Sequence, residues 1–351
     1  MLSNLSALLL AWYEKNKRDL PWRKNISPYG IWISEMMAQQ TRIAQLLPYY
    51  ARFTEKFPAV EALAAASLDE VLAVWAGLGY YARARNLHNA AKIIVNEYAG
   101  EFPETRAGWE RLPGVGNYTA GAVTGIAFGA REAAVDGNVL RVYSRLNDDE
   151  TDISLPAAKK AAAAFLLDTM PDLPHDISRF TQALMELGAL VCVPGKPLCA
   201  NCPLAQVCLS RLNGTVSERP VKTPKKPQIS IDMTVLLIID PSGKVLMRKR
   251  AENLLRGMWV FFLKEEKMTE HEARETARGL GYTVNTVVPL GSASHTFTHR
   301  KWRMDGYALF VNETRAADDY VFLSPDDARK AALPRAIQYY TEWYFDNYTV
   351  F

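Results

Sequence analysis

The chain has 351 residues, which is too long for one average domain, so two domains are expected. About half of the residues are apolar and the net charge is +3, a mildly basic balance that permits a nucleic-acid partner without requiring one. No apolar run reaches the roughly 18 residues of a membrane span, and residues 6–12 lack the flanks of a signal peptide. We therefore expect a cytoplasmic protein with no membrane partner.

The first two-thirds of the chain predict an all-α domain over residues 1–215. Alanine- and leucine-rich stretches recur between Pro, Gly and Asp breaks, and no β-rich run interrupts them. The predicted helical stretches are 60–75, 82–98, 119–128, 157–170 and 177–191.

Residues 27–41 predict an almost wholly apolar helix that carries one carboxyl, Glu35. Ile31 and Gln39 share its face, because residues four apart are neighbours on a helix. A carboxyl among apolar groups has a raised pKa, which suits a general acid. An isolated helical Glu is more often solvated or ion-paired, so this segment alone leaves both interpretations open.

Residues 109–123 place Gly114 and Gly116 in a tight loop between two helical stretches. Glycines there allow close backbone approach, and the amides of the following helix point outward, which suits a DNA phosphate. An ordinary helix–helix turn is the alternative for such a short motif. Farther along, Asp136 and Asn138 precede another helix, where Asp-Gly-Asn is equally typical of a turn and helix cap.

All four cysteines fall within residues 192–208, as Cys192, Cys199, Cys202 and Cys208. Their clustering indicates one tetrathiolate site rather than scattered disulfides. Four thiolates can hold zinc or a [4Fe–4S] cluster. The single C-x2-C pair favours the cluster, and zinc remains the alternative. Because four ligand positions are filled, the site is expected to be structural.

Residues 216–230 contain a Pro- and Lys-rich run without periodicity, which predicts an extended linker. Residues 231–351 then predict an α+β domain. Strands are expected over 233–239 and 244–250 around a turn, helices start at Thr269 and Ser324, and residues 302–310 predict a hairpin around Asp305-Gly306.

The loop string Leu112-Pro-Gly-Val115-Gly and the cysteine run together resemble the endonuclease III superfamily of helix–hairpin–helix DNA glycosylases. Its lyase members carry a lysine nucleophile where this chain has Tyr118. Without that amine no Schiff base forms, so the chemistry is expected to stop at the glycosidic bond.

Five strings in order resemble, over nearly the whole chain, the adenine DNA glycosylases of the MutY type. They lie at residues 20–23, 32–41, 78–87, 135–139 and 186–192. The resemblance implies a [4Fe–4S] cluster, and double-stranded DNA with A:8-oxoguanine or A:G mispairs as the partner of a monomer, which in a bacterium would be nucleoid-associated.

The resemblance also assigns residue roles. Glu35 protonates adenine N7, ionised Asp136 stabilises the oxocarbenium-like sugar, and Tyr118 and Asn138 lie beside that sugar. The flipped base is surrounded by Trp22, Arg23, Gln182 and Glu186. The remaining DNA contacts are Gln40, Thr41, Leu78, Gly79, Leu112, Gly114, Val115 and Gly116, with Tyr80 as the wedge in the base stack. Without the resemblance, core packing is the simpler interpretation of Tyr80.

The C-terminal part resembles the Nudix-like domain of these enzymes. Arg278 and Gly279 stand where a hydrolytic Nudix helix has paired glutamates, and arginine cannot ligate magnesium, so binding without hydrolysis is expected. Phe297, Thr298 and His299 occupy the loop that recognises 8-oxoguanine in this family, with Thr298 in place of serine. A solvated loop at a strand end is the alternative.

Three other functions remain as alternatives. A bifunctional glycosylase/lyase is disfavoured by Tyr118, and a nucleotide pyrophosphatase by Arg278 and Gly279. A lesion-binding protein without catalysis is disfavoured by the joint presence of Glu35 and Asp136.

Overall fold

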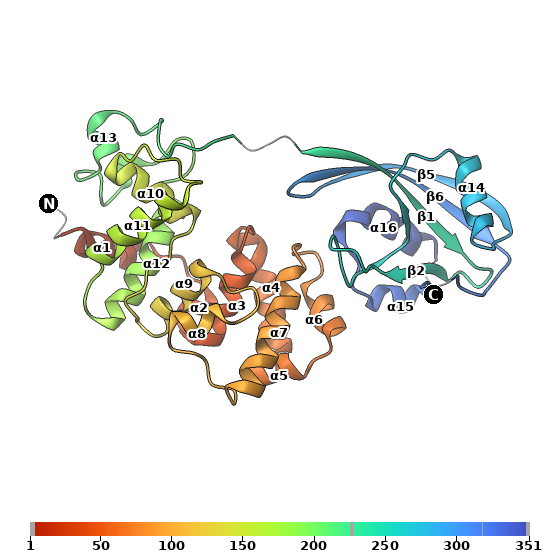
Figure 1. Ribbon diagram of the computed structural model, residues 1–351, viewed down its shortest axis with the longest axis horizontal. Coiled ribbons are helices and arrows are strands. Elements are labelled where there is room, and N and C mark those ends of the chain that lie inside the picture. Colours follow the sequence, from red (N-terminus) through yellow and green to blue (C-terminus); the bar gives the residue numbers. More distant parts are fainter. Residues whose placement is uncertain (1–3, 225–227, 318, 349–351) are drawn as a thin grey trace. The chain divides into compact units, whose positions relative to one another are not determined.

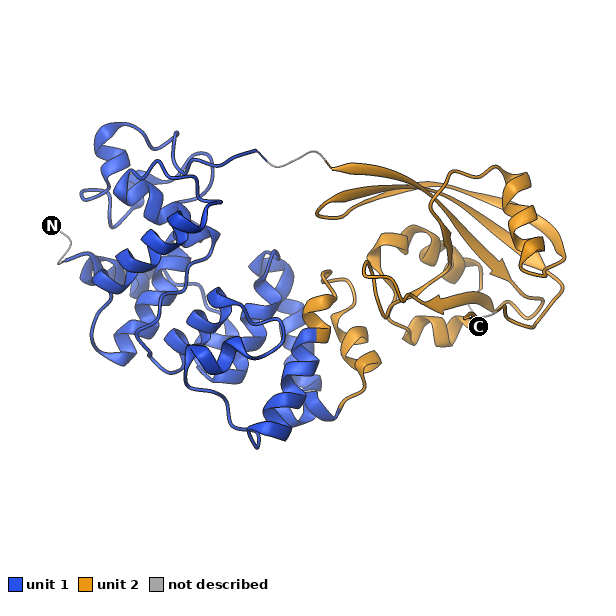
Figure 2. Cartoon of the chain, viewed as in Figure 1, with its two compact units in different colours: residues 1–65, 86–225 blue, residues 66–85, 226–351 orange. Residues whose placement is uncertain are grey.

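The computed structural model describes residues 4–224, 228–317 and 319–348. They form two compact units, one comprising residues 1–65 and 86–225 and the other residues 66–85 and 226–351 (Figure 2). The boundary at 225/226 falls inside the segment predicted as a linker. Residues 219–223 of that segment are held to the first unit, because Ile153 N donates to Val221 O and Arg219 pairs with Asp148 and Glu150.

The described part of the chain up to residue 215 is helical, as predicted (Figure 1). Its α-helices are α1 (Leu5–Asn16), α2 (Pro21–Lys24), α3 (Pro28–Ala38), α4 (Ile43–Lys56), α5 (Val60–Ala65), α6 (Leu68–Trp75), α7 (Ala82–Glu97), α8 (Arg106–Glu110), α9 (Asn117–Ala127), α10 (Gly137–Asn147), α11 (Pro156–Thr169), α12 (Pro174–Leu190) and α13 (Leu209–Asn213). Helix α12 packs against α1, α9 and α10, while α3 packs against α9. These contacts bring together the elements that carry the candidate site.

The stretch predicted as one helix over 60–75 is divided in two. Ser67 interrupts it and caps α6: its hydroxyl accepts from Glu70 N, and the Glu70 carboxylate accepts from Ser67 N. This reciprocal capping satisfies two backbone donors and makes a new helix start more favourable than continuation.

The segment 66–85 groups with the C-terminal unit through polar contacts. Lys249 Nζ lies 2.6 Å from an Asp69 carboxylate oxygen, and the Arg85 guanidinium donates to Arg256 O over 2.6 Å. The predicted boundaries at 215 and 231 did not anticipate this grouping, since its partners are distant in sequence.

The C-terminal unit is a mixed sheet with helices, in agreement with the α+β prediction. Strand β1 pairs in parallel with β6, β5 pairs antiparallel with β6, and β2 and β4 pair antiparallel with β1. The elements are β1 (Ile229–Ile239), β2 (Val245–Lys249), β3 (Trp259–Val260), β4 (Phe262–Lys264), α14 (Glu270–Gly279), β5 (Val284–Thr296), β6 (Arg300–Val311), β7 (Val321–Leu323), α15 (Pro325–Lys330) and α16 (Gln338–Asn347).

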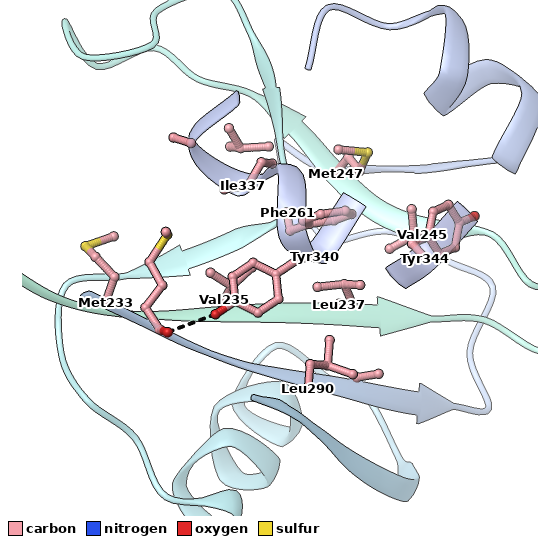
Figure 3. Packing of buried hydrophobic residues seen from close by; sticks show 14 of the residues in the cluster. Met233, Val235, Leu237, Val245, Met247, Phe261, Leu290, Ile337, Tyr340 and Tyr344 are labelled. Atoms are coloured by element: carbon pink, nitrogen blue, oxygen red, sulfur yellow. Dashed lines mark hydrogen bonds between the residues drawn. The ribbon is translucent and has the colours of Figure 1, made fainter. Parts of the chain in front are cut away.

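The core of this sheet packs against the last helix. Val235 and Leu237 of β1 lie beside Tyr340 and Tyr344 of α16, and Tyr340 Oη donates to Met304 O (Figure 3). The buried tyrosines thus satisfy their hydroxyls while their rings exclude water from the sheet.

The predicted hairpin around Asp305-Gly306 is wrong. Strand β6 runs without interruption from Arg300 to Val311, and Gly306 pairs within it with Val235 and Gly291. A Cβ at Gly306 would lie 2.1 Å from the Tyr340 ring, so glycine is required by packing rather than by a turn. The actual hairpin joins β5 to β6, where Phe297 N donates to Arg300 O.

In the described parts of the chain, every helix is too short or too polar to span a lipid bilayer.

Candidate active site

The first unit contains a cavity of about 1,270 Å³ that gathers most of the predicted catalytic and base-binding residues. Its lining includes Glu35, Gln40 and Thr41 from the α3 region, Gly114, Gly116 and Tyr118 around the α9 start, Asp136 and Asn138 at the α10 start, Gln182 and Glu186 of α12, and Trp22 and Arg23 of α2. Folding therefore brings residues that are up to 164 positions apart in the sequence, such as Trp22 and Glu186, to the same cavity.

Glu35 lies in the interior of α3, where Ser27 caps the helix and Pro28 occupies its first turn. The residue is 9% exposed, and one Glu35 oxygen accepts from Tyr118 Oη over 2.7 Å. Burial raises the pKa of Glu35 to about 7, with the charge of Asp136 acting in the same direction and the Tyr118 hydrogen bond opposing it. A substantial fraction of this carboxyl is therefore protonated at neutral pH.

The raised pKa of Glu35 predicts a pH-dependent stability. Between its usual pKa of 4.5 and about 7, the folded state binds more protons than the unfolded state, so stability falls as pH rises through this window. The full cost, reached above pH 7, is about 3 kcal/mol. We expect urea denaturation at pH 5 and pH 8 to show that Glu35→Gln removes this fall in the free energy of unfolding. Glu55→Gln, on the exposed face of α4, should leave the fall unchanged. An unchanged pH dependence in Glu35→Gln would contradict the prediction.

Asp136 caps α10, as the helix-cap interpretation of Asp-Gly-Asn predicts. Its carboxylate accepts from Val139 N over 2.7 Å and from Asn138 Nδ2 over 2.9 Å. Burial raises the pKa of Asp136, and these hydrogen bonds and the charge of Arg141 reduce this rise without reversing it. Glu35 accepts one hydrogen bond from Tyr118, whereas Asp136 accepts from a backbone amide and a side-chain amide, so the ionised form is better supported at Asp136.

Arg141, which was not predicted, connects this cap to the cysteine loop. Its guanidinium donates to Asn138 Oδ1 over 2.9 Å, and to Cys192 O and Gly188 O over 2.7 Å each. Asn138 in turn donates to Asp136. Arg141 lies three residues after Asn138 on the same helix face, and this spacing was the signal that could have identified it.

Glu186, which also lines the cavity, is held by two arginines. Arg18 donates to it from its backbone N, Nε and Nη2 over 2.7–2.8 Å, and Arg23 Nη2 donates over 2.8 Å. Burial of Glu186 opposes ionisation, but the two arginines outweigh it and hold its pKa at about 2. Sequence reasoning missed Arg18, because a charged residue before Leu20-Pro-Trp-Arg23 does not differ from a solvated one in pattern.

In the loop between α8 and α9, one glycine is packed against a neighbouring side chain and another lies beside open space. A Cβ at Gly114 would lie 2.6 Å from Asn86 Cβ, whereas one at Gly116 would meet nothing within 4 Å. Gly116 precedes α9 without any side-chain cap, so the first amides of α9 are available to a partner. Leu112 and Val115 are buried, so their side chains serve packing rather than contact with DNA.

The four cysteine thiols line one small cavity after α12, together with Arg145 and Arg211. Arg145 Nη1 lies 3.5 Å from Cys192 Sγ and also donates to Val193 O. Among the described residues, no three His, Cys, Asp or Glu side chains are spaced to hold a single metal ion.

The remaining predicted residues lie in the second unit. Tyr80 is 45% exposed, has a positive φ of 50°, and its hydroxyl lies 3.2 Å from Thr298 Oγ1. Gly79, with a φ of 80°, accepts from Arg83, while Leu78 is buried. The fold thus places Tyr80, expected from the resemblance to be the wedge in the base stack, beside Thr298 of the expected 8-oxoguanine loop.

Thr298 and His299 are exposed at the tip of the β5–β6 hairpin, but Phe297 is partly buried. The Phe297 ring lies 4.8 Å from that of Trp302 and 4.7 Å from that of His295. Phe297 therefore anchors the tip, and the two residues after it are available for contact.

Comparisons with known proteins agree with both parts of the chain. A model of the HhH-GPD superfamily of base excision DNA repair proteins matches residues 33–166, and a NUDIX domain model matches residues 234–343. The adenine DNA glycosylase of Mus musculus is 33% identical over 371 residues, covering 88% of this chain and 71% of that protein. The adenine DNA glycosylase of Buchnera aphidicola subsp. Baizongia pistaciae is 36% identical, covering 72% and 70%.

Two solved structures resemble the helical part. A thermostable thymine-DNA glycosylase matches with a TM-score of 0.54 and 28% identity, covering 60% of this chain and 97% of its own. Endonuclease III in a non-covalent DNA complex matches with a TM-score of 0.51 and 25% identity, covering 61% and 98%.

Proposed function

Because the chain belongs to the adenine DNA glycosylase family and acts in base excision repair, we propose that it excises adenine opposite 8-oxoguanine or guanine without cutting the strand. The observation that carries this proposal is the cavity in which a buried Glu35, with a pKa of about 7, shares space with the hydrogen-bonded carboxylate of Asp136. Acid and ionised partner at one site are what glycosidic hydrolysis requires.

Glu35 serves as the general acid of the proposed reaction. Adenine leaves poorly until N7 is protonated, and Glu35 holds a proton near neutral pH because burial disfavours its charge. Tyr118 Oη orients the acid by its 2.7 Å hydrogen bond. Since this position carries a phenol rather than an amine, no Schiff base forms and the strand stays intact.

Asp136 acts on the sugar of the same nucleotide. As the glycosidic bond stretches, the deoxyribose gains positive charge, which an ionised carboxylate stabilises electrostatically or by transient attachment before water completes hydrolysis. Val139 N and Asn138 Nδ2 hold this carboxylate in place and favour its ionised form.

The base itself is held beside Glu186. Trp22, Arg23 and Gln182 line the same cavity, and the ion pairs of Glu186 with Arg18 and Arg23 hold the arginine side chains in place before the base arrives. Because the base must leave the duplex to enter this cavity, its nucleotide is flipped out of the helix. DNA phosphates bind the uncapped backbone amides at the start of α9.

The four cysteines would hold a [4Fe–4S] cluster. They line one cavity, and the Arg145 guanidinium beside Cys192 suits a group rich in thiolate charge. The cluster would supply structural support to the loop after α12.

The purified protein is expected to be brown and to contain iron and acid-labile sulfide, because thiolate-to-iron charge transfer absorbs visible light. Visible absorption, iron and zinc analysis check this expectation. A colourless, zinc-loaded protein would refute the cluster.

The C-terminal domain reads the lesion without hydrolysing nucleotides. Arg278 ion-pairs with Glu275 over 2.6 Å, and Gly279 carries no ligand, so the paired carboxylates of a magnesium site are missing from this helix. The exposed Thr298 and His299 at the hairpin tip offer hydrogen bonds to 8-oxoguanine, and Tyr80 beside Thr298 would fill the stack next to it.

A duplex with one central A:8-oxoguanine pair tests the function. We expect free adenine and a strand that breaks only after alkali treatment, whereas the same duplex with A:T should stay intact. A strand nicked without alkali would favour the glycosylase/lyase alternative, and bound but unprocessed duplex would favour a lesion-binding protein.

A further inference from the structure

A second cavity, of about 280 Å³, lies on the first unit between α1, α2 and α12. Tyr13, Lys17, Ile26 and Arg179 are among its lining residues. Drug-sized ligands occupy cavities of about 300–1,000 Å³, so this volume is adequate for a smaller molecule such as a free purine base. None of the proposed chemistry uses this cavity.

The two cavities share part of their lining. Arg18, Arg23 and Gln182 line both the catalytic cavity and the second one. Their side chains therefore form the partition between the two spaces. These are also residues of the proposed base pocket, so the second cavity begins where the excised base would lie.

One side chain of the partition, that of Arg18, reaches solvent. The Arg18 side chain is 33% exposed, whereas Glu186, which it pairs with, is only 1% exposed and also pairs with Arg23. If Arg18 turns toward solvent, Glu186 keeps a charged partner, which avoids the large cost of an unpaired buried carboxylate. The links that then remain are the hydrogen bonds from Arg18 N and Arg23 Nη2 to Glu186, from Arg23 Nη1 to Arg18 O, and from Tyr13 Oη to Gln182 Oε1.

Arg23 provides a polar contact on the way. Its Nε is buried and finds no hydrogen-bond acceptor among the described residues. A buried donor without an acceptor is costly. Because this Nε is closed to solvent, a purine ring nitrogen can accept from it only after the Arg23 side chain turns.

Base flipping gives a second exit a use. The nucleotide enters while attached to its strand, so bound DNA covers the mouth of the catalytic cavity when the bond breaks. We propose that free adenine leaves through the second cavity, past Arg18, Arg23 and Gln182, while the abasic DNA remains bound. This inference rests on the proposed base pocket and adds a product route to it.

The test compares three rates in one reaction. Excess full-length protein, with its cluster, is mixed with an A:8-oxoguanine duplex labelled in the target adenine. Base cleavage is followed by alkali-labile strand, adenine release by rapid filtration, and DNA release by chase with unlabelled duplex. We expect adenine to appear with cleavage and well before DNA dissociates. Adenine that stays bound until the DNA leaves would overturn the exit.

Narrowing the second cavity should slow only adenine release. Ile26 and Lys24 line the second cavity but not the catalytic one. Ile26 is 43% exposed, and the Lys24 side chain is 66% exposed. Ile26→Trp and Lys24→Trp should each slow adenine dissociation about tenfold at an unchanged cleavage rate. Leu173→Trp, at an exposed residue outside both cavities, is the matched control.

The possible results separate this inference from the proposed function. Wild-type release rates in both cavity variants would overturn the exit even if cleavage proceeds normally. If wild-type protein forms no free adenine from the A:8-oxoguanine duplex, the proposed function fails first and the exit fails with it.

Discussion

Glu35→Gln should lower the single-turnover rate of adenine release by about 10²–10⁴-fold, the range that general acid catalysis contributes. Glutamine preserves the shape of the side chain and can still accept from Tyr118 Oη, but it carries no proton for N7. Since burial favours the neutral carboxyl in the wild type, the neutral amide should not disturb the fold.

The measurement is the rate of alkali-labile strand formation with enzyme in excess over an A:8-oxoguanine duplex. In the wild type this rate should fall as pH rises above about 7, because the acid then loses its proton. Glu55→Gln is the control and should retain the wild-type rate and pH profile. Undiminished turnover by Glu35→Gln would remove the acid from the mechanism.

Asp136→Asn should lower the same rate by about 10²–10³-fold or more, as the loss of an electrostatic partner of the transition state does. Asparagine is also a good helix cap, so α10 should still begin at Gly137 and Val139 N should keep its acceptor. The substitution thus removes charge while it preserves the local structure.

Binding and thermal stability distinguish a chemical from a structural role of Asp136. We expect the variant to bind a lesion duplex in fluorescence anisotropy about as tightly as the wild type, with a similar Tm. Asp168→Asn, on the exposed surface of α11, is the control for losing one negative charge. Weak binding by Asp136→Asn together with a lowered Tm would count against its catalytic assignment.

Much of the fold could be predicted because local patterns specify it. The helical first part, the strands around the Asp240–Gly243 turn, and the caps at Thr269 and Ser324 all depend on residues close in sequence, and the structure confirms them. The predicted family and its two kinds of domain are likewise confirmed, since the motifs that carry them are short and contiguous.

The errors arise where distant contacts outweigh local preference. Asp305-Gly306 is typical of a turn, yet the sheet extends through it because the ring of Tyr340 packs against Gly306. The segment 66–85 groups with the C-terminal unit through Asp69 and Arg85, whose partners lie 180 and 171 residues away. No periodicity in the sequence reports such pairs.

The sequence by itself determined which chemical groups are present: one carboxyl in an apolar helix, a second at a helix start, a phenol in place of an amine, and four clustered thiols. The tertiary structure alone decided what those groups can do. Burial of Glu35 on the side of α3 that meets Tyr118 of α9 raises its pKa to about 7, and capping hydrogen bonds limit the rise that burial causes in the pKa of Asp136. Both effects depend on solvent exclusion and on neighbours brought together by folding, which no single segment encodes.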